Sequence, residues 1–383
     1  MLKAQKYRLY PTPLQIDLIN QHIGSCRFIY NLALETKQMA YAGNKVNLSC
    51  FDLMKQMTDL KKELPWLKEV NAQSLQQAIT NMDTAYTNFF KGRADFPKFK
   101  KKTGRGSFRI PQSIKIQDNK FFFPKFKEGI RIILDRPIIG IIKQATISRT
   151  PSGKYFVSIL IDTQISIPQR KEITEEGSIG IDLGLKSFLV TSDGQTFDNQ
   201  RFYKKNLKRL KFLQSRASKY KGKRTRHKLA LLHEKIANQR NDFLHKISTQ
   251  LIKSHDSLCI EDLNIKGMLQ NHSLAQAISD VSWSEFVRQL TYKAEWYGTN
   301  IIKIGRFDPS SKTCSNCGGI NKELTLSDRE WTCIKCDTKH DRDLNAAKNI
   351  KAFGLRNHLS GEHRHQNQGE LPTMVGVMTP EIS

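Results

Sequence analysis

The sequence of 383 residues has no apolar run long enough to cross a membrane, which takes about 20 residues. The stretch 130–142, for example, is interrupted by three charged residues and a proline. The first residues, MLKAQKYRLYPTP, are too polar for a secretory signal. We therefore expect no membrane partner and a protein of the cytoplasm or nucleoid.

Acidic residues are scarce relative to basic ones. Asp and Glu number 36 against 62 Lys and Arg, which gives a net charge of +26. Two stretches concentrate the excess: residues 91–127 hold twelve basic residues and two acids, and residues 201–228 hold thirteen and none. So large an excess indicates a polyanionic partner, and nucleic acid is the first candidate.

The sequence also lacks the regular cysteine pattern of a disulfide framework. Three of its seven cysteines are scattered singly, as small buried side chains often are: Cys26, Cys50 and Cys259. The other four form two C-x2-C pairs with fifteen residues between them: Cys314, Cys317, Cys333 and Cys336. This spacing is typical of a ribbon in which four thiolates hold one structural Zn2+. Because such a site leaves no open coordination position, we expect it to have a structural or nucleic-acid-contacting role.

Hydrophobic patterning in the first half predicts a strand, a helical block and a small barrel. A strand at residues 2–10 precedes Thr12, whose capping box with Gln15 starts a helix, and helical patterns continue to about Phe90. Short strands follow between residues 110 and 161. We expect them to form a small antiparallel barrel or sandwich, which the first strand joins, ending at a polar linker.

Beyond the linker, strands and helices alternate. The predicted order is strand, hairpin, helix, strand, helix, strand and helix, which is typical of an RNase H-like sheet. A capping box of Ser282 with Glu285 is expected to start one of these helices, and Gly354 to end the last one.

Three carboxylates occupy matching places in this order. Asp182 and Glu261 each end a predicted strand, and Asp343 opens the final helix. In an RNase H-like sheet such acids converge, and their repulsion calls for Mg2+ or Mn2+, which favour hard oxygen ligands. Two such ions can activate a water and stabilise the leaving oxygen of a phosphodiester. Alternatively, Asp343 serves only as a helix cap and Glu261 only as an edge carboxylate. The neighbours Asp262 and Asp341 are the competing assignments.

The stretches that carry these residues resemble the motifs of the TnpB family, transposon-encoded RNA-guided DNA nucleases related to type V CRISPR effectors. They are GIDLG at 180–184, IEDLN at 260–264, GRFDPSSKTCSNCG at 305–318 and DRDLNAAKNI at 341–350. The stretches 89–109 and 283–298 are similar to the family as well, so the resemblance covers nearly the whole chain to about Gly354. It implies that Asp182, Glu261 and Asp343 are a RuvC-type catalytic triad and that the ribbon is a target-nucleic-acid-binding insert.

The resemblance also implies a multidomain α+β fold. A β-barrel wedge domain is interrupted by a helical recognition lobe, and an RNase H-like (RuvC) α/β nuclease domain carries the zinc ribbon as an insert. The expected boundaries are 1–10 and 105–167 for the wedge, 11–104 for the recognition lobe with its basic, phenylalanine-rich end, 178–310 and 338–354 for the nuclease, 311–337 for the ribbon, and 355–383 for a flexible tail.

Members of this family use a guide RNA from the transposon end to cut double-stranded DNA beside a short adjacent motif, so the resemblance implies both partners in a prokaryotic cytoplasm. Basic residues are the expected phosphate contacts: Lys98, Lys100, Lys101, Lys102, Arg105, Arg109, Lys204, Lys205, Lys208 and Arg209. Gln73 and Gln77, one helical turn apart, could read adenine in the adjacent motif. The oligomeric state is open, and one chain with its RNA is favoured.

Two other functions stay open. Relatives that have lost the nuclease acids act as RNA-guided repressors, but all three acids are present here. An RNase H-like transposase could use the same acids for strand transfer, because one fold serves both reactions. The resemblance to guide-binding proteins favours the nuclease.

Overall fold

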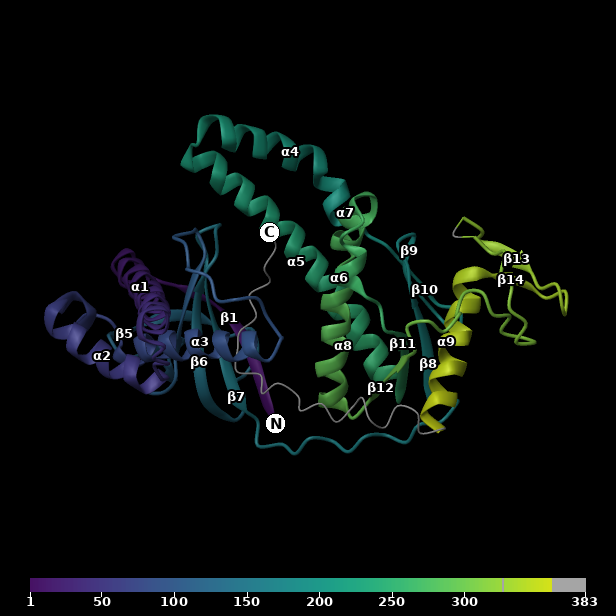
Figure 1. Cartoon of the computed structure of the whole chain (residues 1–383), viewed down its shortest axis with the longest axis horizontal. Helices are drawn as coiled ribbons and strands as arrows, with labels where there is room; N and C mark the ends of the chain where they lie inside the picture. The colour runs from purple at the N-terminus through teal and green to yellow at the C-terminus, as the bar shows by residue number, and fades with distance from the viewer. Residues whose placement is uncertain (326, 360–383) are drawn as a thin grey trace. The chain divides into compact units, whose positions relative to one another are not determined.

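The structure, a computed structural model, describes residues 1–325 and 327–359. This part of the chain forms two compact units, Met1–Ser166 and a second unit that begins at Ile167. Each unit is built around its own sheet (Figure 1). None of the helices in the described ranges is long and apolar enough to cross a membrane.

The first unit holds a seven-stranded antiparallel sheet with the order β2-β6-β7-β1-β5-β4-β3, which curls into a half-barrel. Strand β1 (Leu2–Tyr10) lies between β7 and β5, so the expectation that it joins the later strands is confirmed. A closed barrel is not formed within the described residues, because β2 and β3 each pair on one side only. The other strands are β2 (Gly106–Ile110), β3 (Lys115–Gln117), β4 (Lys120–Phe123), β5 (Phe126–Ile133), β6 (Ile141–Arg149) and β7 (Tyr155–Asp162).

The helical block predicted between β1 and β2 is present. Its elements are α1 (Pro13–Asn44), α2 (Cys50–Glu63), the 3-10 helix η1 (Pro65–Lys68) and α3 (Ala72–Phe90). The predicted capping box starts α1: the Thr12 hydroxyl accepts the Gln15 N–H at 3.4 Å, and the Gln15 side chain accepts the Thr12 N–H at 3.0 Å. The helices share one apolar core with the sheet, which includes Ile19, Leu34, Leu75, Phe121 and Ile132.

A buried histidine fastens α1 to the start of α3. The Nε2 atom of His22 accepts the Asn71 N–H at 3.0 Å, and Nδ1 lies 2.8 Å from the Leu18 carbonyl oxygen. Burial lowers the pKa of His22 to about 4, so the ring is neutral at pH 7. Protonation of Nε2 would place two donors face to face, and the contact therefore requires the neutral ring.

The second unit contains a five-stranded sheet with the order β10-β9-β8-β11-β12. Strands β8 (Ser178–Leu183), β11 (Ser257–Glu261) and β12 (Asn300–Ile304) are parallel, and β12 forms one edge of the sheet. Strands β9 (Ser187–Thr191) and β10 (Thr196–Asp198) add an antiparallel hairpin beside β8. Because β8 and β11 run in the same direction, their carboxyl ends lie side by side at one edge of the sheet.

Helices cover both faces of this sheet. Helices α5 (Lys223–Ser254) and α8 (Trp283–Tyr297) pack against Leu258 and Ile260 of β11, whereas α9 (Arg342–Leu359) packs against Cys259. Figure 1 shows α9 on one side of β8 and β11, and α5 with α8 on the other. This division follows from the strand geometry, since successive side chains point to opposite faces. The remaining elements are α4 (Phe202–Tyr220), α6 (Ile265–Met268), α7 (His272–Val281), β13 (Glu330–Thr332) and β14 (Lys339–Asp341).

One expected helix end and one expected capping box are wrong. Helix α9 does not end at Gly354 but continues to Leu359. A glycine is required at this position because a Cβ would lie 2.6 Å from the Cys259 sulfur. Gly354 is therefore a packing position inside the helix rather than a stop. The expected flexible tail loses residues 355–359 to this helix, and residues 360–383 lie outside the described ranges. At the start of α8, Ser282 adopts a left-handed conformation (φ 58°) with no side-chain cap.

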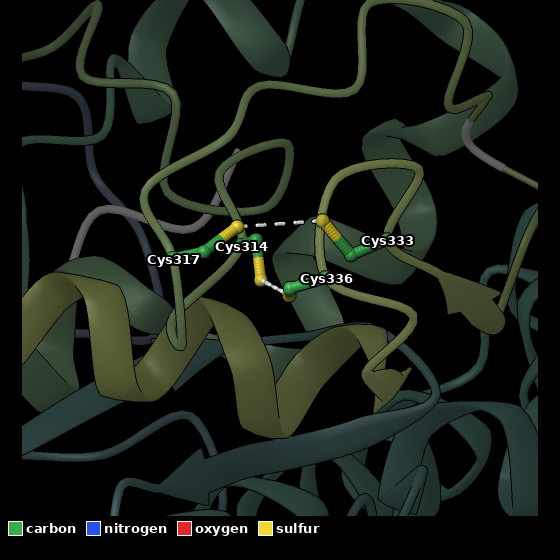
Figure 2. Close-up of side chains that lie close together, drawn as sticks. All are labelled: Cys314, Cys317, Cys333 and Cys336. Atoms are coloured by element: carbon green, nitrogen blue, oxygen red, sulfur yellow. Dashed lines mark hydrogen bonds between the residues drawn. The ribbon is translucent and has the colours of Figure 1, made fainter.

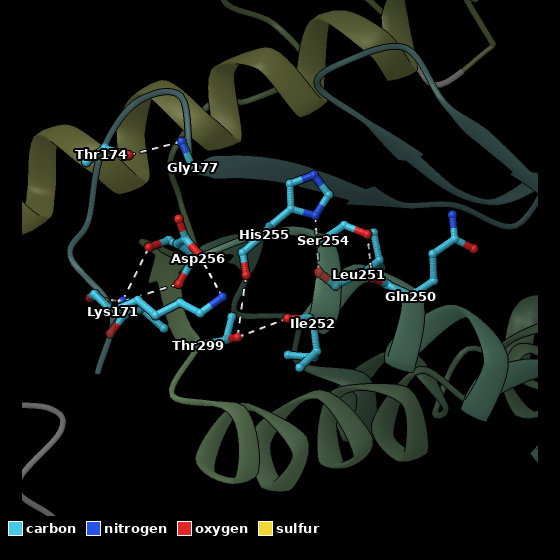
Figure 3. A network of polar contacts seen from close by, with 12 residues as sticks. Lys171, Thr174, Gly177, Gln250, Leu251, Ile252, Ser254, His255, Asp256 and Thr299 are labelled. Atoms are coloured by element: carbon cyan, nitrogen blue, oxygen red, sulfur yellow. Dashed lines mark hydrogen bonds and ion pairs between the residues drawn. The ribbon is translucent and has the colours of Figure 1, made fainter. Parts of the chain in front are cut away.

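The polar linker, residues 168–177, is fastened to the second unit (Figure 3). The Lys171 ammonium lies 2.7 Å from the Asp256 carboxylate, and the Lys171 N–H donates to the Gly298 carbonyl oxygen at 2.8 Å. The Asp256 N–H donates to the Gly177 carbonyl oxygen at 2.8 Å. Nearby, the Thr299 hydroxyl donates to the Ile252 carbonyl oxygen at 3.1 Å. These contacts join the linker to the amino ends of the central strands, opposite the edge where Asp182 and Glu261 lie.

Candidate functional site

The register of the central strands places two of the predicted acids next to each other. Ile260 of β11 pairs with Ile181 of β8, so the residues that follow, Glu261 and Asp182, are neighbours at the carboxyl edge. Asp182 lies two residues after Gly180, where a Cβ would meet the backbone of α9. Because residues two apart on a strand share a face, Asp182 faces α9, and Glu261, two residues after Cys259, faces it as well.

The third acid comes from α9 itself. Asp343 lies in the first turn of this helix. The helix cap is supplied by Asp341, whose Oδ1 accepts the Leu344 N–H at 2.8 Å, and not by Asp343. The pKa of the Asp182 carboxyl is raised well above its ordinary value, first by burial and then by the nearby negative charges of Glu261 and Asp343. The three carboxylates therefore lie near enough to one another to interact electrostatically.

The competing acid Asp262, which directly follows β11, has other partners. Asp262 is paired with Lys303 at 3.0 Å and with Arg306 at 3.1 Å, and both partners lower the pKa of its carboxyl. Asp262 therefore serves an exposed ion-pair cluster.

Two of the three acids are held by neighbouring side chains. The Ser310 hydroxyl donates to Glu261 Oε1 at 2.7 Å, and the Arg329 guanidinium lies 3.5 Å from Asp343 Oδ1. Across the described ranges, the four cysteines are the one group of metal-ligating side chains gathered closely enough to hold an ion. The three acids share a face without reaching that spacing.

The predicted cysteine cluster is confirmed. Figure 2 shows the four side chains turned toward one another from two loops, and all four sulfurs lie within 4.8 Å of one another. The sulfurs of Cys314 and Cys336 are 3.6 Å apart, as are those of Cys317 and Cys333. A tetrahedral Zn2+ with Zn–S bonds of about 2.3 Å separates its sulfurs by about 3.8 Å. The cluster therefore fits a metal such as zinc.

A histidine beside the cluster was missed by the sequence analysis. His340 on β14 is buried, and its Nε2 atom lies 3.0 Å from the Cys314 sulfur. Its ring rests on Trp331 of β13 at 4.8 Å between centroids. An imidazole N–H at this place can donate a hydrogen bond to the Cys314 sulfur. Its position between the last cysteine of the ribbon, Cys336, and Asp343 was the available signal.

Helix α9 also holds the ribbon in place, through two buried amides that the sequence analysis did not single out. Asn345 accepts the Ser315 N–H at 2.9 Å and donates to the Thr313 carbonyl oxygen at 2.7 Å. One turn later, Asn349 donates to the carbonyl oxygens of Ser310 and Thr313 at 2.7 and 2.6 Å. One helix thus carries Asp343, anchors the first cysteine loop, and fixes the serine that binds Glu261.

Some of the predicted nucleic-acid contacts are engaged with other residues of the chain, and the others have exposed side chains. Gln73 and Gln77 lie on α3 as expected, and Gln77 accepts a hydrogen bond from Arg109 at 3.2 Å. The Lys100 ammonium lies over the Tyr30 ring at 3.8 Å, so it is turned toward α1. Lys98 lies 3.9 Å from Asp95. The other predicted basic contacts have exposed side chains: Lys101, Lys102, Arg105, Lys204, Lys205, Lys208 and Arg209.

Family models match three parts of the chain. Residues 158–272 match the model described as "Probable transposase", and residues 283–350 match "Cas12f1-like, TNB domain". Residues 1–45 match "Helix-turn-helix domain", although the structure forms strand β1 and the single helix α1 there. Together the matches define the class as a transposon protein of the IS605 type.

The chain belongs to the TnpB family. It is 37% identical over 371 residues to the "Putative RNA-guided DNA endonuclease" of Streptomyces pristinaespiralis, covering 94% of this chain and 91% of that protein. It is 32% identical to the "Putative RNA-guided DNA endonuclease InsQ" of Escherichia coli strain K12, covering 92% of each. The fold matches a chain in the "Cryo-EM structure of the Cas12f1-sgRNA-target DNA complex", with a TM-score of 0.56, 15% identity, and coverage of 89% of this chain and 83% of that chain.

Proposed function

We propose that the chain is an RNA-guided, divalent-metal-dependent DNA endonuclease encoded by a transposon. It would cut guide-complementary DNA next to a short adjacent motif. The observation that carries this proposal is the approach of Asp182, Glu261 and Asp343 on the α9 face of the sheet. A second support is the 37% identity, over nearly the whole chain, with a relative named "Putative RNA-guided DNA endonuclease".

The nuclease domain is assigned to residues 178–310 and 338–359, with the cysteine ribbon at 311–337 as its insert. Support comes from the strand order β10-β9-β8-β11-β12 with an antiparallel hairpin at one side, which resembles an RNase H-like (RuvC) sheet. Residues 1–10 and 105–167 form the wedge, and residues 11–104 form the recognition lobe. The ribbon would hold one Zn2+ and contact target nucleic acid.

The three acids would hold Mg2+ or Mn2+. When bound, these ions supply an activated water and neutralise charge on the leaving oxygen of the phosphodiester. Within the chain, the Ser310 hydroxyl donates to Glu261 Oε1 and would orient this carboxylate toward a bound metal. Arg329 and Arg342 lie near Asp343 and Asp182, where their charges partly balance the acids.

The partners proposed are a guide RNA and double-stranded target DNA. The net charge of +26 supports a polyanionic partner, and the exposed basic residues of α4 offer phosphate contacts. In this scheme, guide pairing sets the sequence that is cut, and the protein reads duplex shape and the adjacent motif.

A pair of neighbouring acids tests the catalytic assignment. The protein is purified from cells that carry its flanking transposon DNA, and the bound RNA is sequenced. The complex is then given Mg2+ and a guide-matched plasmid. Glu261→Gln should abolish cutting and retain the RNA, whereas Asp262→Asn should keep cutting, because Asp262 contacts Lys303 and Arg306 instead. Equal loss in both variants would contradict the assignment.

The same experiment separates the alternatives. Bound RNA without cutting by the wild-type chain would indicate a guide-dependent repressor. The match to the family model described as "Probable transposase" supports strand transfer as the second candidate function. Joining of a labelled transposon end to target DNA without any RNA would support it.

A further inference from the structure

The hairpin formed by α4 and the beginning of α5 has a strongly cationic surface. Figure 1 shows the two helices side by side, extending past the sheet of the second unit. Residues 201–228 hold thirteen Lys and Arg and no acid, and all thirteen side chains are exposed. Within the described part of the chain, no ion pair involves any of them. This charge is therefore not used inside the fold.

An aromatic ladder lies within this charged surface. Phe212 and Tyr220 on α4 are 57% and 61% exposed. Between them, the Arg216 guanidinium lies 5.5 Å from the Phe212 ring centroid and 5.7 Å from that of Tyr220. The spacing of four residues puts the three side chains on one side of the helix. Large exposed rings have an energetic cost in water, so a ladder of this kind indicates a ligand surface.

Apolar packing and a helix cap hold the helix that carries these three side chains. Leu210 and Leu213 of α4 are buried and pack against Leu232 and Ile236 of α5. The start of α4 is capped from α7, where the Asp280 carboxylate accepts the N–H groups of residues 203 and 204 at 2.9 and 3.2 Å. The exposed side chains can therefore be replaced without removing the contacts that hold the hairpin.

We propose that Phe212, Arg216 and Tyr220 form a stacking platform for unpaired nucleotides of a single-stranded nucleic acid. Planar bases stack on aromatic rings and guanidinium groups, while the lysines and arginines around the ladder contact phosphates. A double helix hides its base faces, so it would use the charges but not the rings. The inference rests on the proposed function only in expecting a nucleic-acid partner, and it adds the segment that binds and its chemistry.

The test measures binding of the full-length protein to 20-nucleotide oligo(U) RNA and oligo(dT) DNA at several salt concentrations. Phe212→Ala and Tyr220→Ala should each weaken single-strand binding by about tenfold or more, with an unchanged salt slope. Phe212→Tyr should retain binding. Lys211→Ala should reduce the salt slope by about one instead. The matched control is Tyr41→Ala, which removes another exposed ring (58%) with a lysine ammonium 5.1 Å from its centroid.

Stacking also has a direct signal. Fluorescence of 2-aminopurine in the bound strand should be quenched by the wild-type chain and not by the Phe212→Ala, Tyr220→Ala double variant. The two oligonucleotides identify which single strand is preferred. Three results would overturn the platform. The double variant could bind single strands as tightly as the wild-type chain, it could lose duplex DNA binding to the same extent, or it could lose only the binding of an acidic polypeptide probe. If guide-dependent cutting persists in that case, the proposed function stands without it.

Discussion

Replacing Asn345 by alanine is predicted to release the first cysteine loop from α9. The Asn345 side chain is 2% exposed and makes two hydrogen bonds, at 2.9 Å from the Ser315 N–H and at 2.7 Å to the Thr313 carbonyl oxygen. Each bond contributes about 0.5–1.5 kcal/mol, and an orphaned partner adds about 1–3 kcal/mol. Since the Thr313 oxygen keeps its bond from Asn349, the orphan is the Ser315 N–H. The loop should open more easily by about 2–6 kcal/mol.

Hydrogen exchange of the Ser315 amide measures this opening directly. A loss of about 2–6 kcal/mol corresponds to exchange that is faster by about 30- to 20,000-fold, at about 1.4 kcal/mol per factor of ten. Lys348→Ala, an exposed change on the same helix, should leave the amide within about threefold of wild type. Ser315 exchange that is unchanged in Asn345→Ala would refute the anchoring role of the amide.

Three further predictions follow from the site and the fold. Ser310→Ala should weaken Mn2+ binding, measured by calorimetry, by about tenfold, because the hydroxyl no longer orients Glu261. Ser310→Thr should restore the affinity, and Ser311→Ala should leave it unchanged. Equal Mn2+ affinities of Ser310→Ala and the wild-type chain would contradict the orienting role. Cys314→Ser should lose zinc by elemental analysis while Cys50→Ser retains it, and full retention in both would exclude the ribbon site. Acid should destabilise the first unit: since the folded pKa of His22 is about 4 and the unfolded value about 6.5, stability is complete above pH 6.5 and falls by about 3 kcal/mol as the pH drops to 4. A flat profile in denaturant unfolding, or one unchanged by His22→Gln, would contradict that shift.

Local signals were sufficient for some features and misleading for others. The capping box at Thr12 forms because both partners lie within one helical turn. The same pattern at Ser282 is wrong, since that residue links two helices and its hydroxyl donates to the Ser279 carbonyl oxygen, while Glu285 pairs with Arg288. A glycine at position 354 fits both a helix stop and a packing contact, and only the tertiary neighbour Cys259 decides between them.

The acid cluster could be anticipated because strand ends and parallel pairing follow from chain order. Asp182 and Glu261 lie at the carboxyl ends of adjacent strands, and the register makes them neighbours. The supporting residues could not be predicted, because their partners are distant in sequence. Asn349 binds a carbonyl oxygen 39 residues away, and Ser310 binds an acid 49 residues away. Such contacts arise from the packing of the ribbon on α9, which periodicity does not encode.

Reprogramming the guide tests the central claim most directly. The guide segment of the co-purified RNA is replaced by an unrelated sequence, the complex is rebuilt with Mg2+, and the cut is mapped on a plasmid that carries both targets. The account predicts that the cut moves to the new target and disappears in the Glu261→Gln chain. A cut that stays at the original position, or that forms without RNA, would contradict an RNA-guided nuclease.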